Sequence, residues 1–489
     1  MSPLASRLRA GRVFLGPPGG QLVEPPCPCA PQRQVRKPMT SARELIDASP
    51  LSRLQIRVIV LCALVSMAEG YDIISISLAV LPITDDWGIS GAQSGLLFSG
   101  GLIGMAVGSI ALGPVGDRYG RRPLLIGSLV VITVGVALSA VAADVTQLAL
   151  LRLLTGLGMG GIIPSLPIIV GEYCPARKRS TLIALFAIGI PAGGVLGGAA
   201  GSVLMSSFGW RAAFVFGALI TAATVVVAYA GIPESPDYLE TKGTEASRKK
   251  LDALIQKMNL PGTLGDADEH RTIEAPSLGA VGSAALKSWA LVTTCIAFCL
   301  VNSAYFFGNT WTPKLLKLAG LSNNEGIGGG LLFSLGGAVG MLLFAALTLR
   351  FASMRVTAGF VAAGALLFAL MSSVSSQLSP TLVAAALLGL CLNAAYAGLY
   401  VMVPLLFRPE ARVSALGIAA GLGRIGSIAT PLGIGALVDR SWAADSIFLV
   451  FVIPTLAAAA VIAYASVRNA RESPAAPVVD GVTAGGASA

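Results

Sequence analysis

Residues 101–136 read GLIGMAVGSIALGPVGDRYGRRPLLIGSLVVITVGV, two apolar runs separated by a short segment with four charged side chains. A hydrophobic run of about 20 residues is long enough to cross the hydrocarbon core of a bilayer as an α-helix. The glycines of the charged segment, GPVGDRYGRRP at 113–123, permit a tight turn. The stretch therefore predicts two membrane-spanning helices joined by a short basic turn.

The same alternation continues along the 489 residues, of which 54% are hydrophobic and only 12% are charged. A soluble protein has about 25% charged residues, so this composition excludes an ordinary soluble chain. We predict an all-α polytopic membrane protein with twelve transmembrane helices embedded in the lipid bilayer. The expected spans are residues 57–83, 91–114, 122–143, 145–170, 181–206, 210–232, 288–313, 327–349, 356–376, 380–404, 413–438 and 443–467.

Basic residues are concentrated in the loops that follow even-numbered spans, as in the turn at 113–123. The positive-inside rule therefore places both termini in the cytoplasm. The net charge of +9 reflects this asymmetry, and we expect no nucleic-acid partner.

One long polar segment divides the spans six and six. Residues 1–38, rich in Pro, Gly and Arg, lack the apolar region of a secretory signal. We expect them to be dispensable or an over-extended start. The predicted organisation is a disordered tail and lead-in (1–50), an N-terminal six-helix half (51–232), a cytoplasmic linker (233–287), a C-terminal six-helix half (288–470) and a disordered tail (471–489).

The two halves resemble each other at an offset of 234 residues. CPARKRSTLIALFAIG at 174–189 aligns with RPEARVSALGIAAGLG at 408–423, including identities in the polar loops. Parallel six-helix repeats are typical of secondary transporters, whose binding site lies at the repeat interface near the bilayer midplane.

Two carboxylates lie inside the first span, in SMAEGYDIIS at 66–75. Glu69 and Asp72 are three positions apart and so share one face of a helix, although an ionised Asp at the bilayer centre costs about 3 kcal/mol. The only histidine, His270, lies in the central linker, which leaves membrane proton chemistry to carboxylates. We predict that Asp72, with Glu69 beside it, is the proton site.

Two arginines also lie within spans. Arg152 begins RLLTGLGMGG at 152–161, where it faces a partner or a water-filled cavity or, alternatively, extends to the outer surface. Arg424, in the interior of the eleventh span, can bind a carboxylate through two parallel hydrogen bonds. The alternative for Arg424 is a structural salt bridge to Asp72 or Glu69.

Amphipathic tyrosine and amide side chains in the second half suit an aromatic ring that bears hydroxyl groups, although each also fits ordinary helix packing. These candidates are Tyr305, Asn309, Asn393, Tyr396 and Tyr400. The seven cysteines show no paired spacing, so we expect neither a disulfide framework nor a metal site.

GPVGDRYGRRP closely resembles the loop motif of the major facilitator superfamily, with Gly, Asp, Arg, Gly, Arg and Arg at matching spacing. RLLTGLGMGG resembles a second pattern of that superfamily, Arg-x-x-x-Gly-x-Gly-x-Gly. The resemblance implies that Arg152 takes part in proton coupling and that the loop locks and releases one conformation. The implied gating residues are Gly113, Asp117, Arg118, Gly120, Arg121, Arg122 and Glu172, the last matching a family acid.

EGYD in the first span resembles the Asp-Gly-(Phe/Tyr)-Asp motif of the aromatic acid:proton symporter family, with Glu69 in place of the first Asp. SPLSRLQ, EYCPARKRS, IPESP and GLGRIGSI agree with that family, and the resemblance covers most of residues 39–440. It implies a transporter of the cell inner membrane that couples uptake of an organic anion, such as a hydroxybenzoate, to protons without another cofactor. We expect a monomer that binds substrate through Arg424, Tyr305, Asn309, Asn393 and Tyr396.

Other functions remain open at this point. The anion could be another organic acid or a sugar acid. Drug efflux is a further alternative, but antiporters of the superfamily carry Gly-Pro-x-x-Gly-Gly in the fifth span, and GIPAGGVLGG at 189–198 departs from that order. An enzyme is not expected, because the sequence shows no nucleophile–base set, phosphate-binding loop or metal cluster.

Overall fold

The computed structural model describes residues 41–260, 289–407 and 412–472. Twelve helical segments in these ranges are long and apolar enough to cross a membrane, which confirms the predicted fold class. The predictions for residues 1–38, for His270 and for the tail after Glu472 lie outside the described residues. Residues 471 and 472, expected in that tail, belong to the last helix.

Each span of the N-terminal half corresponds to one helix, except the fifth, which is divided at Ile188. The helices are α2 (Arg53–Trp87), α3 (Gly91–Tyr119), α4 (Arg121–Ser139), α5 (Val145–Tyr173), α6 (Arg179–Ala187), α7 (Gly189–Phe208) and α8 (Arg211–Gly231).

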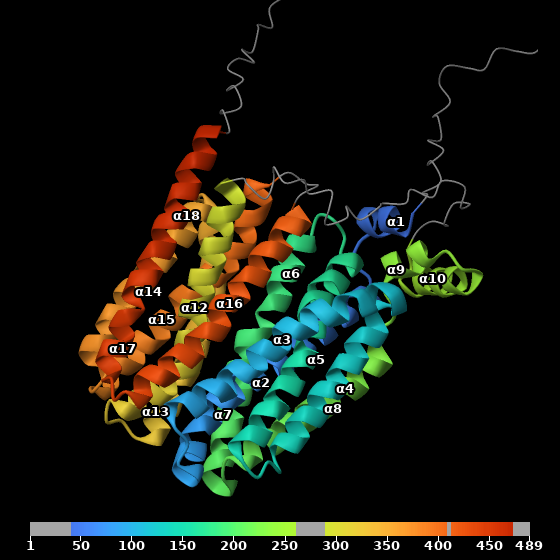
Figure 1. Ribbon diagram of the computed structural model, residues 1–489. Helices are drawn as coiled ribbons and strands as arrows, with labels where there is room; N and C mark the ends of the chain where they lie inside the picture. The colour runs from blue at the N-terminus through green and yellow to red at the C-terminus, as the bar shows by residue number, and fades with distance from the viewer. Residues whose placement is uncertain (1–40, 261–288, 408–411, 473–489) are drawn as a thin grey trace, which may run out of the picture. The chain divides into compact units, whose positions relative to one another are not determined.

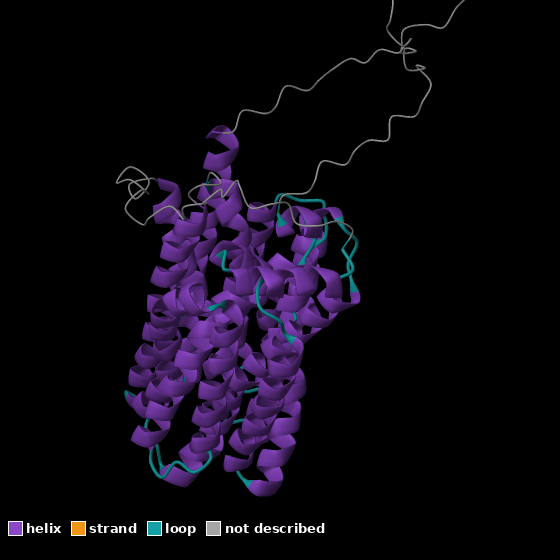
Figure 2. Cartoon of the chain, turned by 90° about the vertical axis from the view of Figure 1, so that its right-hand side faces the viewer, coloured by secondary structure: helices purple, strands orange, loops and turns teal. Residues whose placement is uncertain are grey.

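The C-terminal half repeats this plan, with its last span divided in two. Its helices are α12 (Trp289–Leu318), α13 (Asn323–Thr348), α14 (Ser353–Val374), α15 (Leu378–Leu406), α16 (Arg412–Asp439), α17 (Ala444–Val450) and α18 (Val452–Glu472). Three shorter helices precede the first span or lie in the described part of the linker: α1 (Ala42–Ala48), α9 (Pro236–Lys242) and α10 (Glu245–Lys257). Figure 2 shows helices and loops and no strand in the described part of the chain.

Local sequence sets several helix boundaries. Ser52, Ser90 and Ser322 each begin a helix with a capping box, in which the serine hydroxyl and the side chain three residues later satisfy free backbone N–H groups. Gly88 ends α2 in the left-handed conformation, which a glycine adopts without a steric penalty.

The turn predicted over 113–123 is much shorter than expected. Helix α3 continues to Tyr119 and α4 begins at Arg121, so Gly120 alone joins them, with φ of 111°. That angle favours glycine. Gly113 through Tyr119 extend α3 beyond its apolar part, because helical hydrogen bonds satisfy the backbone of this polar segment as well as they do in the apolar one.

The described residues belong to one compact unit, in which the two halves pack through α3 with α16, α2 with α12, and α7 with α13. Figure 1 shows α3 and α16 side by side between the blue-to-green and the yellow-to-red helices. We call the end of the bundle with Gly88 the Gly88 end, and the opposite end the Gly120 end.

Candidate transport site

Helices α3 and α16 touch closely at the Gly88 end. A Cβ atom on Gly91 would overlap the carbonyl oxygen of Gly435, and one on Gly95 would overlap that of Pro431. One turn further along, the Ser99 hydroxyl donates to the carbonyl of Ile428 at 2.9 Å. Small residues therefore let the two backbones meet directly across the halves.

The same two helices diverge toward the Gly120 end. Arg424 of α16 still reaches α3, where its guanidinium contacts the Met105 sulfur at 3.7 Å. Beyond that level, a Cβ atom on Gly113, Gly417 or Gly421 would meet nothing within 4 Å. The pair thus forms a V that is closed at the Gly88 end, with Arg424 at its vertex.

Other contacts between the halves also lie in the closed part. The Ser77 hydroxyl donates to the carbonyl of Thr310 at 2.9 Å. The Asp439 carboxylate at the end of α16 accepts from the backbone N–H groups of Gly91 (2.5 Å) and Ala92 (2.8 Å), and so caps α3 from the other half.

Asp72 forms a buried ion pair with Arg152 inside the N-terminal half. Arg152 Nη1 lies 3.2 Å and 3.3 Å from the two carboxylate oxygens, and Nη2 lies 3.3 Å from the Thr155 hydroxyl. These distances exceed the usual 2.7–2.9 Å of charge-assisted hydrogen bonds, and Arg152 Nε is buried without a partner among the described residues. Arg152 is 3% exposed, so it lies inside the bundle rather than at the outer surface.

Glu69 lies one turn away in a different environment. It is buried, but within the described part of the chain it has no hydrogen bond or ion pair. It lies close to three residues of the other half, Arg424, Tyr305 and Tyr400. Neither Glu69 nor Asp72 lies within ion-pair distance of Arg424, so the alternative of a structural salt bridge is not seen in this conformation.

The predicted aromatic residues cluster beside Glu69. The rings of Tyr305 and Tyr396 stack with centroids 4.9 Å apart, and the Tyr396 and Tyr400 hydroxyls are 3.2 Å apart. A small cavity between the halves is lined by Tyr305, Asn309 and Asn393 on one side and by Gly70, Ile73 and Pro191 on the other. Asn393 Nδ2 is bonded to the carbonyl of Gly389 in its own helix.

A second cavity connects the ion pair to the other half. Its lining includes Asp72, Arg152, Met105, Phe306 and Thr310. Because Met105 also contacts Arg424, the ion pair, the vertex arginine and the aromatic cluster lie in one region between the halves.

The predicted gating residues gather at the Gly120 end. Arg121 pairs with Asp117 at 3.3 Å and approaches Glu172 at 3.9 Å. The Asp117 side chain is 70% exposed, and the Arg118 guanidinium lies over the ring of Tyr119. The contacts of these residues lie within the N-terminal half.

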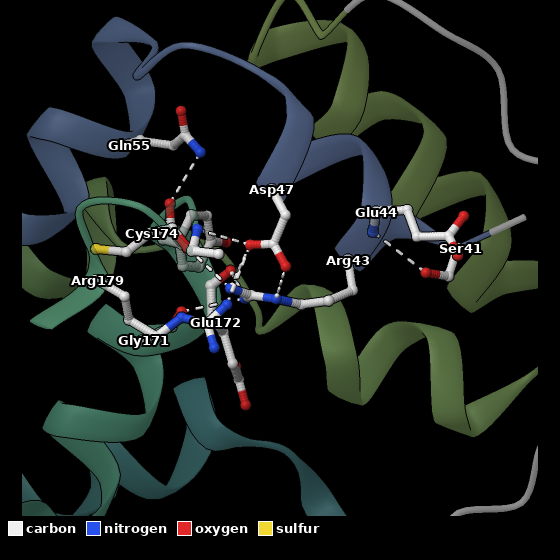
Figure 3. Close-up of polar contacts among 11 residues, drawn as sticks. Ser41, Arg43, Glu44, Asp47, Gln55, Gly171, Glu172, Cys174 and Arg179 are labelled. Carbon is white, nitrogen blue, oxygen red and sulfur yellow. Dashed lines mark hydrogen bonds and ion pairs between the residues drawn. The ribbon is translucent and has the colours of Figure 1, made fainter. Parts of the chain in front are cut away.

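Sequence reasoning missed two parts of this cluster. The Glu234 carboxylate accepts from the Arg122 backbone N–H at 3.0 Å and lies against Gly120. The motif that contains Glu234, IPESP, indicated a resemblance to the family but did not predict this contact. On the short helix α1, Arg43 donates to the carbonyls of Gly171, Glu172 and Cys174, which end α5 (Figure 3).

Asp47 completes the contact of α1 with the loop after α5. Its carboxylate binds Arg43 at 2.8 Å, the Ala176 backbone N–H at 2.8 Å and Arg179 at 3.0 Å (Figure 3). Burial raises the pKa of the Cys174 thiol in this loop to about 11, which keeps it protonated and unreactive. The lead-in to the first span therefore holds the backbone that carries Glu172.

The sequence model of the Major Facilitator Superfamily matches residues 60–382. The chain belongs to this superfamily. It is similar to the 4-hydroxybenzoate transporter PcaK of Pseudomonas aeruginosa, with 29% identity over 436 residues that cover 87% of this chain and 96% of the relative. It is also similar to the gallate transporter of Pseudomonas putida, with 28% identity over 88% of this chain and 96% of the relative.

The fold of this superfamily member matches the crystal structure of a D-xylose–proton symporter, with a TM-score of 0.64 and 17% identity over 83% of this chain and 97% of the other. The predicted resemblance to the superfamily and to aromatic acid carriers is confirmed. The protein is a multi-pass membrane transporter and not an enzyme.

Proposed function

We propose that this transporter takes up an aromatic carboxylate, such as a hydroxybenzoate, together with protons. One observation carries the proposal: near the vertex of the V, the buried Glu69, which has no hydrogen bond or ion pair among the described residues, lies close to Arg424 and Tyr305 of the other half, and Tyr305 stacks on Tyr396. The N-terminal half supplies groups that can carry a proton, and the C-terminal half supplies groups that can bind an aromatic anion. The names of the similar proteins support this substrate class.

Substrate recognition divides among three kinds of side chain. The planar guanidinium of Arg424 binds the carboxylate through two parallel hydrogen bonds. Tyr305 and Tyr396 offer ring faces, and aromatic pairs contribute about 0.5–1.5 kcal/mol beyond the area they bury. Asn309 and Asn393 line the adjacent cavity, where an amide can donate to or accept from a ring hydroxyl.

Proton coupling uses the Asp72–Arg152 pair. A proton on Asp72 removes its negative charge and releases the guanidinium, whose bonds to the carboxylate are already long. Symport of one proton with a monoanion moves no net charge, so the pH gradient alone drives accumulation, about tenfold or ~1.4 kcal/mol per pH unit. If Glu69 also cycles, a second proton adds roughly 2.3 kcal/mol per 100 mV.

The basic Gly120 end faces the cytoplasm in this proposal, in accordance with the positive-inside rule. The protein then lies in the cell inner membrane as a monomer with both termini inside. The open side of the V corresponds to a state that exchanges substrate with the cytoplasm.

Uptake of labelled 4-hydroxybenzoate into proteoliposomes tests the function. The wild-type protein should accumulate the acid when the outside is acidified, and Asp72→Asn should abolish accumulation while it retains slow exchange. Asp86→Asn is the matched control, because Asp86 lies on the same helix at the exposed Gly88 end, beside Arg211 at 3.8 Å. Accumulation by Asp72→Asn would place the coupling proton on another residue, and a wild-type protein without uptake would refute the substrate class.

A further inference from the structure

Lys314 is a buried lysine at the contact between the halves. It belongs to α12, is 5% exposed, and donates from Nζ to the hydroxyls of Ser94 and, at 3.3 Å, Thr84. Both hydroxyls belong to the other half. A side chain that touches the opposite half at the closed end will line the opening when that end separates, as alternating access requires.

The charge of Lys314 lacks a direct counter-ion. Among the described residues, no carboxylate lies within ion-pair distance of its ammonium. Asp85 and Asp439 are close enough to act on it, but Asp85 is bonded to Lys317 and Asn323, and Asp439 caps α3. A buried cation without a directly paired anion is costly, and an anion that reaches it would lower this cost.

Lys314 also lies on the face of α12 that lines the cavity of the Asp72–Arg152 pair further along the helix. Thr310 and Phe306, four and eight residues earlier, share its helical face and line the cavity of the Asp72–Arg152 pair. At 1.5 Å per residue, Lys314 lies ~12 Å along the helix from Phe306. Between them lies Trp311, whose ring is 5.9 Å from the ammonium and whose buried Nε1 has no partner in the described structure.

We propose that Lys314 forms an outer subsite for the substrate carboxylate, which binds there when the Gly88 end is open. The ammonium attracts the anion, and the Trp311 indole supplies an aromatic face and a free N–H donor. From this subsite the anion moves two helical turns along α12 to the central cavity. The inference rests on the proposed function, because it takes the cargo to be an aromatic carboxylate.

Kinetics of 4-hydroxybenzoate uptake in proteoliposomes, with orientation of the protein determined, test the subsite. Lys314→Gln should raise KM for transport from the Gly88 side at least fivefold while it changes the maximal rate less than twofold. Lys314→Arg, which keeps the charge, should stay within twofold of the wild-type KM. The control is Lys249→Gln on α10, because the pair of Lys249 with Glu245 is exposed, contributes little and lies outside the contact between the halves.

The outcomes separate the two proposals. If the wild-type protein is active and Lys314→Gln has an unchanged KM, the subsite is refuted and the proposed function stands. If Lys314→Arg loses affinity as much as Lys314→Gln, packing rather than charge is responsible, which also refutes the subsite. A wild-type protein that transports no aromatic carboxylate refutes the proposed function and the subsite with it.

Discussion

The two ends of the α3–α16 pair have similar small residues but different contacts. At the Gly88 end, Gly91, Gly95 and Gly435 bring the backbones together. At the Gly120 end, Gly113 and Gly417 face open space. The structure shows the pair in contact at the Gly88 end, and the small residues at the Gly120 end would leave room for a similar approach of the two backbones there.

A carboxylate lies at each end of the α3–α16 pair. Asp439 ends α16 and caps the first N–H groups of α3 in the other half. Asp117 lies near the end of α3, exposed and bonded to Arg121 in its own half. If the pair opens at the Gly88 end and closes at the Gly120 end, the last turn of α3 approaches the first turn of α16. Asp117 would then lie near the first backbone N–H groups of α16, as Asp439 now lies at those of α3.

The largest effect is expected at the vertex, where Arg424 lies between the two ends of the pair. Arg424→Lys keeps the positive charge but loses the planar pair of donors, so substrate affinity should fall at least tenfold, or about 1.4 kcal/mol. Equilibrium binding of 4-hydroxybenzoate to the purified variant measures this. Arg412→Lys is the control, because Arg412 lies on the same helix near the Gly120 end and donates to the carbonyl of Phe407. Wild-type affinity in Arg424→Lys would give Arg424 a structural role.

An intermediate effect is expected at the closed end. Asp439→Ala removes a cap across the halves, and loss of such a cap costs ~1 kcal/mol. The state open at the Gly120 end should therefore lose about fivefold in population relative to its alternative. Spin labels on Gly113→Cys and Gly417→Cys, in a background without native cysteines, report the separation of the open ends by pulsed electron resonance.

Asp144 provides the control for this measurement. Its carboxylate also caps a helix, α5, but it accepts from Gln147 within its own half at 2.9 Å. Asp144→Ala should leave the distance distribution unchanged. Asp439→Asn should shift the distribution less than Asp439→Ala, because the amide oxygen can still accept from one of the two backbone N–H groups that the carboxylate binds. Equal shifts for Asp144→Ala and Asp439→Ala would indicate general destabilisation rather than a contact between the halves.

The sequence was sufficient to predict the twelve spans, because apolar runs of that length have few alternatives in a bilayer. It also identified Glu69, Asp72 and Arg152 inside the spans, since each charge is costly in the membrane and must have a reason. It missed the buried Lys314, because the predicted seventh span ended at residue 313. It could not assign their partners. Asp72 and Arg152 are 80 residues apart, and nothing local distinguishes this pairing from one of Asp72 with Arg424.

The contacts of the lead-in and linker were also beyond the sequence. Arg43 and Asp47 form an ordinary i, i+4 pair, and such pairs usually belong to exposed helices. Only the fold brings them to the end of α5. The predicted length of the turn at Gly120 was too great for a related reason. A polar, glycine-rich segment can remain helical where an adjacent helix and Glu234 support it.

The smallest effect is expected at the open end. Asp117 contributes little to the present state, because its exposed i, i+4 pair with Arg121 is worth only about 0.3–0.5 kcal/mol. Its loss should instead hinder formation of the state in which the Gly120 end closes. We expect Asp117→Asn to lower the transport rate about threefold, because the loss of a contact worth ~0.7 kcal/mol corresponds to a threefold change. Substrate affinity should stay within twofold of wild type.

Glu245→Gln on α10 is the control, because it breaks an exposed i, i+4 pair with Lys249 outside the interface. Rates and affinities measured on the same preparations decide the matter: a more than tenfold loss of affinity with normal turnover would make Asp117 a binding residue and contradict its role in closing this end.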